Sequence, residues 1–305
     1  MIPVVAVLLS TYNGEKYIRE QIDSVLAQED VDVRIIIRDD GSHDSTIDIL
    51  KDYQSKFPNI KCLFEDNVGA ETSFHRLCQY AKDNILADYY AFCDQDDVWD
   101  NNKIEVAVQR LRDYPNDSPN LYFSNLKMVD SNLNYIRDLF NHGEVKAVKD
   151  MALVQIFTYG CTCVFNRVAL EMYCIIEQNK TYHDNWVYVL CSYMGNVCYD
   201  PVPHISYRQH GANLSGAKET GLSLAFHRFR KVFSAKGKHD FEVMAKQLLH
   251  FDRYLSGDDL KMILRVANYR QRPSARLWLL FSPKYKADNW FKNLCICYRI
   301  LFNAL

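Results

Sequence analysis

Strands and helices alternate strictly over the first 114 residues of the chain. The predicted strands are apolar runs at residues 3–10, 31–40, 59–66 and 88–93. The predicted helices have apolar residues at helical spacing and cover residues 14–28, 42–57, 70–84 and 101–114. This alternation is typical of βαβ units, which join parallel strands into one sheet. Because the strands are apolar throughout, we expect an α/β fold with helices on both faces of a mostly parallel sheet.

The alternation loosens beyond residue 115. Further strands are expected at 120–129, at 156–167 and, as one or two strands, within 196–209, with a polar insert at 131–147 and a helix from 167 to about 178. From about residue 221 the pattern is helical, with breaks at 234–239, Gly257 and Pro273. We therefore expect an α/β domain at residues 1–217 and a helical region at 218–305.

The charge of the chain is divided in the same way. Residues 218–305 hold 17 Lys and Arg against 7 Asp and Glu, so the remaining 19 basic and 31 acidic residues lie in 1–217. The tail carries +10 and the body −12, which indicates that the two regions have different surroundings. The composition is that of a globular protein, and no apolar run reaches the roughly 18 residues of a spanning helix.

Two features point to a cytoplasmic protein. The ten cysteines lie mostly in apolar segments without CxxC spacing, so we expect reduced core thiols rather than disulfides or a zinc site. The apolar start "IPVVAVLL" lacks a basic flank and a cleavage site, so it is predicted to be a buried strand and not a signal peptide.

Acidic residues follow three of the four predicted strands. The strand ends lead into "STYNGE", "RDDGSHDST", "EDNVG" and "DQDDVW". Ligands of open parallel sheets bind beyond the carboxyl ends of the strands. Crowded carboxylates favour a hard cation, Mg²⁺ or Mn²⁺, which binds phosphate oxygens of a substrate as well. The alternative is that these acids cap helices and form turns, as Asp44 and Asp100 are expected to do.

"STYNGE", "RDDGS" and "DQDDVW", in this order, resemble an inverting glycosyltransferase of family 2 with the GT-A (Rossmann-like) fold. The signatures "HDNW" and "YRQHGANLSG" are similar to those of its rhamnosyltransferase-like branch. The resemblance covers about residues 1–217. It implies that Tyr12 packs against the base of a nucleotide-sugar donor and that Asp40 binds the polar edge of that base. Other residues expected in this donor pocket are Ser10, Asp39, Asn67 and Gly69. Arg208 is expected either to contact the diphosphate or to form a salt bridge.

The same resemblance assigns the chemical roles. Asp94 and Asp96 match the DxD motif that binds the metal and the donor, with Asp96 as direct ligand, and His210 completes the metal site. Asp97 is expected either to contact the metal ligands without binding the metal itself or to reach the donor sugar. Asp184 matches the catalytic base, because a sugar hydroxyl is a poor nucleophile until a carboxylate takes its proton. The alternative for Asp184 is a cap of the helix that follows.

Two residues near these motifs leave questions open. His183 stands where most relatives carry an acidic or aromatic residue, so it is expected to tune the acceptor site or the pKa of Asp184. Gly160 lies in the segment 158–167, which resembles the acceptor-side wall. Because Gly160 has no side chain, the backbone there can approach the sugar. The alternative is that Gly160 marks a strand bulge.

We expect a metal-dependent enzyme that moves a sugar, rhamnose from dTDP-rhamnose, onto a polysaccharide or lipid-linked glycan. A UDP-hexose or UDP-N-acetylhexosamine donor is the first alternative. A phosphohydrolase of the haloacid dehalogenase type is the second, because "DQDDV" mimics its nucleophile motif, although that class carries the motif after its first strand. The third is a non-catalytic scaffold of glycan assembly.

The basic tail has two predicted amphipathic segments, 224–238 and 289–305. Basic amphipathic helices of this kind lie on anionic membrane surfaces. This would place the enzyme peripherally on the inner face of the cell membrane. The alternative is that these helices pack on the catalytic domain or in a homodimer. No nucleic-acid-binding motif accompanies the basic residues, so nucleic acid is not an expected partner.

Overall fold

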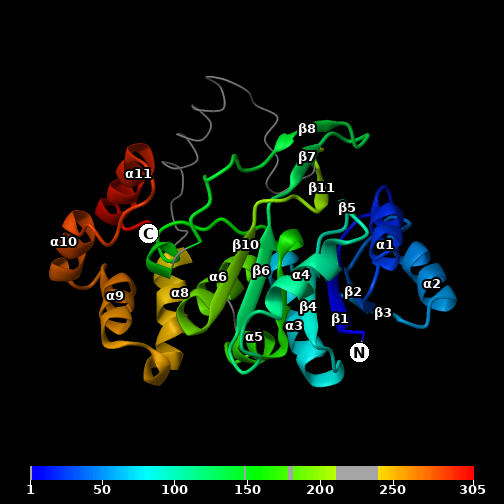
Figure 1. The fold of residues 1–305 in the computed structure, drawn as a ribbon, viewed down its shortest axis with the longest axis horizontal. Helices are drawn as coiled ribbons and strands as arrows, with labels where there is room; N and C mark the ends of the chain where they lie inside the picture. Colours follow the sequence, from blue (N-terminus) through cyan, green and yellow to red (C-terminus); the bar gives the residue numbers. More distant parts are fainter. Residues whose placement is uncertain (1, 148, 178–180, 211–239) are drawn as a thin grey trace. The chain divides into compact units, whose positions relative to one another are not determined.

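The computed structural model describes residues 2–147, 149–177, 181–210 and 240–305 (Figure 1). The chain forms two compact units. The first consists of the described parts of Met1–Val145, Thr158–Cys191 and Gly195–Arg208, and the second of those of Lys146–Phe157, Ser192–Met194 and Gln209–Leu305. The predicted domain boundary at 217/218 and the predicted basic segment 224–238 lie outside the described residues.

A seven-stranded sheet forms the centre of the first unit. Its order is β10-β6-β9-β4-β1-β2-β3. The strands are β1 (Val4–Thr11), β2 (Asp32–Asp40), β3 (Ile60–Glu65), β4 (Tyr89–Cys93), β6 (Asn120–Ser124), β9 (Val164–Asn166) and β10 (Asn196–Asp200). Neighbouring strands are parallel except β9, which runs antiparallel to both β4 and β6. The predicted mostly parallel sheet is confirmed.

Helices cover both faces of this sheet, as the apolar strands predicted. They are α1 (Ile18–Leu26), α2 (Thr46–Lys56), α3 (Ala70–Asn84), α4 (Lys103–Leu111), α5 (Arg167–Tyr173) and α6 (His183–Met194). Val5, Val7 and Leu9 of β1 share one apolar cluster with buried residues of α1, α2 and α4. Ala6 and Leu8 point to the opposite face and are fully buried as well. Because helices cover both faces of the sheet, a ligand is expected at the strand ends.

The segment 120–129, predicted as one strand, is two strands in two sheets. Its second half is β7 (Lys127–Val129) of a smaller sheet, whose other strands are β5 (Val98–Trp99), β8 (Tyr135–Asp138) and β11 (Ile205–Arg208). The chain turns at Asn125, whose side-chain oxygen accepts hydrogen bonds from the N–H groups of Leu126 (2.9 Å) and Phe140 (3.1 Å). The prediction of one continuous strand was wrong because the side chain of Asn125 takes the place of a neighbouring strand as hydrogen-bond acceptor.

The predicted strand 156–167 is also mostly not a strand. Only β9 pairs, and a 3-10 turn at Gly160–Thr162 precedes it. The Thr162 hydroxyl donates to the carbonyl oxygen of Tyr159 at 2.8 Å and closes this turn. The following helix, α5, ends at Tyr173 rather than near residue 178.

The second unit is helical over residues 240–305, as predicted. Its elements are η1 (Lys149–Met151), α8 (Asp240–Leu248), η3 (Leu249–Tyr254), α9 (Gly257–Asn268), α10 (Pro273–Phe281) and α11 (Trp290–Leu301). The predicted breaks at Gly257 and Pro273 coincide with the starts of α9 and α10. Among the described residues, no helix has the length and apolar character needed to cross a bilayer. All ten cysteines are free thiols.

Candidate active site

The carboxyl ends of β1, β2 and β4 meet at one edge of the large sheet. Thr11 pairs with Asp39 across β1 and β2, and Leu9 pairs with Cys93 across β1 and β4. The residues that follow these strands therefore lie side by side, as parallel pairing requires. The predicted donor and metal residues of these three loops are brought to the same place.

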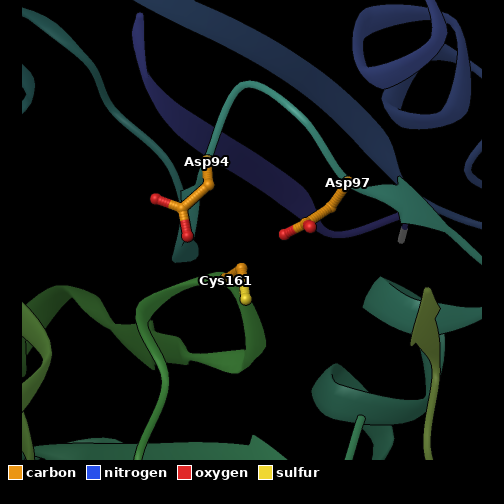
Figure 2. Close-up of side chains that lie close together, drawn as sticks. All are labelled: Asp94, Asp97 and Cys161. Carbon is orange, nitrogen blue, oxygen red and sulfur yellow. The ribbon is translucent and has the colours of Figure 1, made fainter. Parts of the chain in front are cut away.

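Two carboxylates and a thiol form a compact group beyond β4. One ligand atom each of Asp94, Asp97 and Cys161 lies within 4.8 Å of the others. Figure 2 shows the two acids on the loop after β4 and Cys161 on the segment facing it. One oxygen of Asp97 accepts the N–H of Arg208 at 3.0 Å, and the other has no hydrogen-bond partner among the described residues.

The negative charges of the carboxylates in this acidic group repel one another. Burial raises the pKa of Asp94 to about 7, and the neighbouring charges of Asp96 and Asp184 add to that rise. Burial also raises the pKa of Asp97, with the charges of Asp96 and Asp94 as further causes. Carboxylates that are buried and close to one another are stabilised by a bound cation. Their oxygens and the unpartnered Asp97 atom fit the ligand preference of Mg²⁺ or Mn²⁺.

Asp184 lies in the first turn of α6 and close enough to raise the pKa of Asp94. The N-cap of α6 is Tyr182, so Asp184 is not the cap residue. Burial raises the pKa of Asp184 to about 6, although its carboxylate accepts the N–H of Asn185 at 2.8 Å, which lowers it. A carboxylate whose pKa is near 6 is suited to accept a proton near neutral pH.

His183, next to Asp184, is a buried and neutral ring. It stacks on Phe74 with ring centres 3.8 Å apart and meets Phe92 edge-on at 4.5 Å. Burial lowers the pKa of His183 to about 3, and neither ring nitrogen has a hydrogen-bond partner among the described residues. A Cβ on Gly160 would lie 2.4 Å from Nε2 of His183. Gly160 is therefore required for the close approach of this ring.

A pocket of about 480 Å³ lies beside β2 and β3. Its lining residues are Asp39, Gly41, Ile47, Phe64, Glu65, Asp66 and Arg76. The carboxylate of Asp39 accepts the hydroxyl and the N–H of Ser42. The pocket therefore contains Asp39, one of the residues predicted to bind the donor. The ring of Tyr12, the predicted stacking partner of the base, is 43% exposed.

Asp40 is turned away from solvent toward the loop after β3. It forms a buried ion pair with Arg38 at 2.5 Å and accepts the N–H groups of Val68 (2.8 Å) and Gly69 (2.9 Å). It thereby fixes the loop that carries Asn67 and Gly69. Contact of Asp40 with a base stays a prediction.

Ser10 belongs to the same hydrogen-bond network as Asp40. Its hydroxyl lies 2.6 Å from that of Ser73, which accepts a hydrogen bond from Arg38. In this structure Ser10 therefore supports the Arg38–Asp40 ion pair.

Gln95 joins the first loop to the fourth. Its side-chain oxygen accepts from the Thr11 hydroxyl (2.6 Å) and the Tyr12 N–H (2.8 Å), and its amide nitrogen donates to the Tyr12 carbonyl (3.2 Å). Gly14 leaves room for this amide, because a Cβ there would lie 2.6 Å from the oxygen. Gln95 was not predicted as a site residue, although its place between the two acids of "DQD" was a signal.

Three predicted site residues have other contacts in the structure or lie in the second unit. Asp96 is not one of the residues of the Asp94, Asp97 and Cys161 group, and its main-chain oxygen accepts a hydrogen bond from the Arg208 guanidinium at 2.9 Å. Arg208 is 2% exposed and also binds the Ser131 carbonyl and the Glu20 carboxylate, which corresponds to the salt-bridge alternative. His210 belongs to the second unit. Their contacts with metal or donor stay predictions.

Comparison with known proteins identifies the family. The model of the family described as Glycosyl transferase family 2 matches residues 6–173. The dTDP-rhamnosyl transferase RfbG of Shigella flexneri is 33% identical over 229 residues, which cover 68% of this chain and 74% of RfbG. The chain belongs to glycosyl transferase family 2. It is a glycosyltransferase, as the resemblance predicted.

Solved structures share the fold of this glycosyltransferase at low sequence identity. S. aureus TarS 1-349, in complex with UDP-GlcNAc, matches with a TM-score of 0.61 and 16% identity, covering 99% of this chain and 81% of TarS 1-349. The mannosyltransferase PcManGT from Pyrobaculum calidifontis, in complex with GDP-Man and Mn²⁺, matches with a TM-score of 0.50 and 13% identity, covering 99% of this chain and 88% of PcManGT. The predicted GT-A fold is confirmed.

Cys161 and Lys103 of the glycosyltransferase were missed as site residues. Cys161 was expected to be an ordinary core thiol, and nothing in "YGCTC" marks it as a neighbour of "DQDD". Lys103 is a fully buried cation whose Nζ lies 3.5 Å from the centre of the Trp99 ring. Burial lowers the pKa of Lys103 to about 8, and the charge of Asp97 opposes this shift. Its position directly after "VWDNN" was the available signal.

Replacing Gly160 by Ala is expected to reduce both stability and activity of the glycosyltransferase. The added Cβ must displace the His183 ring, which Phe74 and Phe92 hold in place, and the start of α6 moves with it. Overpacking of this kind costs about 1–3 kcal/mol. A shift of Asp184 by about 1 Å is expected to lower kcat by up to about 100-fold. Thermal melts and initial transfer rates measure the two effects.

Gly257→Ala is the matched control for this substitution. No atom lies within 4 Å of a Cβ at Gly257, which begins α9. Alanine there is expected to keep activity and to stabilise the helix by up to about 1 kcal/mol. Equal melting and equal activity of the two variants would contradict the role given to Gly160.

Proposed function

We propose that this glycosyltransferase transfers rhamnose from dTDP-rhamnose to a glycan hydroxyl with inversion, assisted by Mg²⁺ or Mn²⁺. The observation that supports this best is the position of Asp184 beside the Asp94–Asp97 group, which brings a proton acceptor next to a cation-binding set. Inverting transfer needs these two functions around one anomeric carbon. The name of RfbG supports rhamnose as the sugar.

Asp94 and Asp97 would hold the cation, with Asp96 and His210 as the further ligands that the resemblance implies. A bound divalent cation neutralises the charge that builds up on a leaving diphosphate. PcManGT, which shares the fold, was solved with Mn²⁺. The half-buried Asp94 and the buried Asp97, both with raised pKa values, are consistent with the same requirement.

Asp184 would act as the base. It accepts the proton of the acceptor hydroxyl while that oxygen forms a bond to the anomeric carbon and the bond to the diphosphate oxygen breaks. Because attack and departure occur on opposite faces of the sugar, the anomeric configuration inverts. The raised pKa of Asp184 matches proton transfer near neutral pH.

The pocket that Asp39 lines is the proposed site of the nucleotide. Tyr12 follows the strand that pairs with the strand of Asp39, so its exposed ring is available to stack on a base. Stacking tolerates thymine and uracil alike, so the base alone does not fix the donor. A UDP-hexose or UDP-N-acetylhexosamine is the alternative donor, which the UDP-GlcNAc complex of TarS favours.

The acceptor is proposed to be a growing polysaccharide or a lipid-linked glycan, and the place of action the cytoplasm. The phosphohydrolase alternative is not retained, since the family is that of glycosyltransferases and "DQDD" follows β4 rather than the first strand. The scaffold alternative predicts no turnover, so a transfer assay decides against it or for it.

A thermal-shift panel tests the donor. The full chain is melted with dTDP-rhamnose, UDP-glucose, UDP-galactose, UDP-GlcNAc and GDP-mannose, each with Mn²⁺ and with EDTA. A saturating donor at about 100 times its Kd stabilises by about 2.7 kcal/mol. We expect a shift that dTDP-rhamnose causes and that EDTA removes. A shift with UDP-sugars alone would show that the donor is a UDP-sugar and not dTDP-rhamnose. Equal shifts with Mn²⁺ and with EDTA would contradict the proposed metal dependence.

A further inference from the structure

Helix α10 has one buried side and one exposed apolar side. Ala275 and Leu279 are buried within the second unit. Leu277 and Phe281 are exposed, and Phe281 keeps 79% of its surface open. Residues four apart lie on the same face of a helix, so these two side chains form one apolar edge.

Helix α11 repeats this arrangement next to α10 (Figure 1). Ile296 and Ile300 are buried, whereas Trp290, Leu294 and Leu301 are exposed. The spacing of four and seven residues places the three exposed side chains in one stripe. Trp290 is 77% exposed. A tryptophan open to water at the start of such a stripe is unusual for a surface that has no partner.

Two exposed phenylalanines, Phe291 and Phe302, widen the stripe of α11. We refer to the exposed apolar residues of these two contacting helices, with Phe302 directly after α11, as the α10–α11 apolar face: Leu277, Phe281, Trp290, Phe291, Leu294, Leu301 and Phe302. Soluble surfaces carry single exposed apolar residues, but seven on two adjacent helices mark an interaction surface.

The segment that carries this face is strongly basic. Residues 270–302 contain one acidic residue, Asp288, and seven basic ones, a formal charge of +6: Arg270, Arg272, Arg276, Lys284, Lys286, Lys292 and Arg299. Arg272 and Lys284 form no ion pair with any described residue. On α11 the basic Lys292 and Arg299 lie seven residues apart, which places them on a side different from the apolar stripe.

We propose that the α10–α11 apolar face docks on a membrane surface that contains anionic lipids. The apolar side chains enter the boundary between headgroups and acyl chains, and the basic side chains contact lipid phosphates. Large apolar residues, an exposed tryptophan and flanking Lys and Arg are the combination that such surfaces bind. The helices lie on the bilayer, because neither is long enough to span it.

The charge distinguishes a bilayer from a second copy of the chain. Two copies that met through this face would bring two segments of +6 together, and like charges across an interface oppose association. An anionic surface instead attracts the basic residues of the segment that form no ion pair with a described residue, such as Arg272 and Lys284. The charge therefore favours lipid as the occupant of the face.

Vesicle co-sedimentation of the full chain tests the docking. We expect binding to vesicles of phosphatidylcholine with phosphatidylglycerol, weakening as salt is raised, and no binding to phosphatidylcholine alone. Binding should shift the emission of Trp290 to the blue, and a Trp290→Phe variant should lose that shift. Equal binding to both vesicles, or no binding to either, overturns the proposal.

Two double variants separate the apolar and the charged contributions. Phe281→Ser with Trp290→Ser, and Arg272→Glu with Lys284→Glu, are each expected to weaken vesicle binding about tenfold or more. Leu86→Ser is the matched control, because Leu86 is an apolar residue of the first unit with 81% exposure. All five positions are exposed, so melting should be unchanged.

Self-association is the competing outcome. If the wild-type chain forms dimers that Phe281→Ser with Trp290→Ser dissolves, and if vesicles do not bind, a second copy occupies the face and the proposal is wrong. If both double variants bind vesicles as the wild type does, the face is not the docking surface.

Discussion

Replacement of Asp184 by Asn is expected to lower the transfer rate by about 10²–10⁴-fold while donor affinity stays the same. The amide has the shape of the carboxylate but cannot take the proton of an acceptor hydroxyl. In the proposed site the donor is held by the loops after β1, β2 and β4, none of which contains Asp184. Initial rates measure the first effect, and calorimetric titration with the donor measures the second.

The pH profile makes this result specific to a base. Burial raises the pKa of Asp184 to about 6, and only the ionised form can act as the proposed base. The wild-type rate should therefore be complete above this pKa and fall as the pH drops through about 6. The residual rate of the Asn variant should lack this step.

Asp83→Asn is the control for Asp184→Asn. Asp83 is an acid of α3 whose side chain is 64% exposed, so its loss should leave rate and profile unchanged. An Asp184→Asn rate within tenfold of the wild type, or an unchanged pH step, would show that another group takes the proton.

Replacement of Asp94 by Asn is expected to stabilise the metal-free protein and to abolish its stabilisation by Mn²⁺. A carboxyl whose pKa is raised from 3.8 to about 7 contributes stability at low pH that is lost as the pH rises through the raised value. At pH 8 the ionised Asp94 thus destabilises the fold, and a neutral amide does not. We expect a gain on the order of 1 kcal/mol, or about 2–4 °C.

Melting curves with EDTA and with Mn²⁺ check both parts of this expectation. The wild-type protein should gain about 2.7 kcal/mol from Mn²⁺ at 100 times its Kd, and the variant should gain nothing. Asp83→Asn should respond to Mn²⁺ as the wild type does. A metal-free variant that melts lower, together with an unchanged response to Mn²⁺, would contradict the cation site at Asp94.

The parallel part of the fold could be predicted because its signals are local. Helix α3 was predicted at 70–84 and forms at Ala70–Asn84, since its apolar periodicity is uninterrupted. A strand was predicted at 156–167, but the antiparallel pairing of β9 within that segment could not be predicted. Strand β9 inserts between β4 and β6, more than 30 residues away along the chain, and a three-residue strand has no periodicity of its own.

Some features of the candidate site could likewise be predicted from the sequence and others could not. Acids after strand ends could be located because a parallel sheet brings its carboxyl ends together. Side-chain directions could not, since Asp39 and Asp40 are adjacent in sequence and only Asp39 lines a pocket, whereas Arg38 holds Asp40. Cys161 depends on a turn that follows a long insertion, so no local pattern places it beside Asp94.

The thiol of Cys161 beside two carboxylates has a practical consequence for biochemists. Sulfur ligands favour softer ions such as Zn²⁺ over Mg²⁺, and affinities for divalent ions rise along the first transition row toward Cu²⁺. Trace contaminants from chromatography resins or buffers are therefore expected to compete for the proposed cation site more strongly than they would at a pair of acids alone. Preparations should be stripped of adventitious ions before any assay is interpreted.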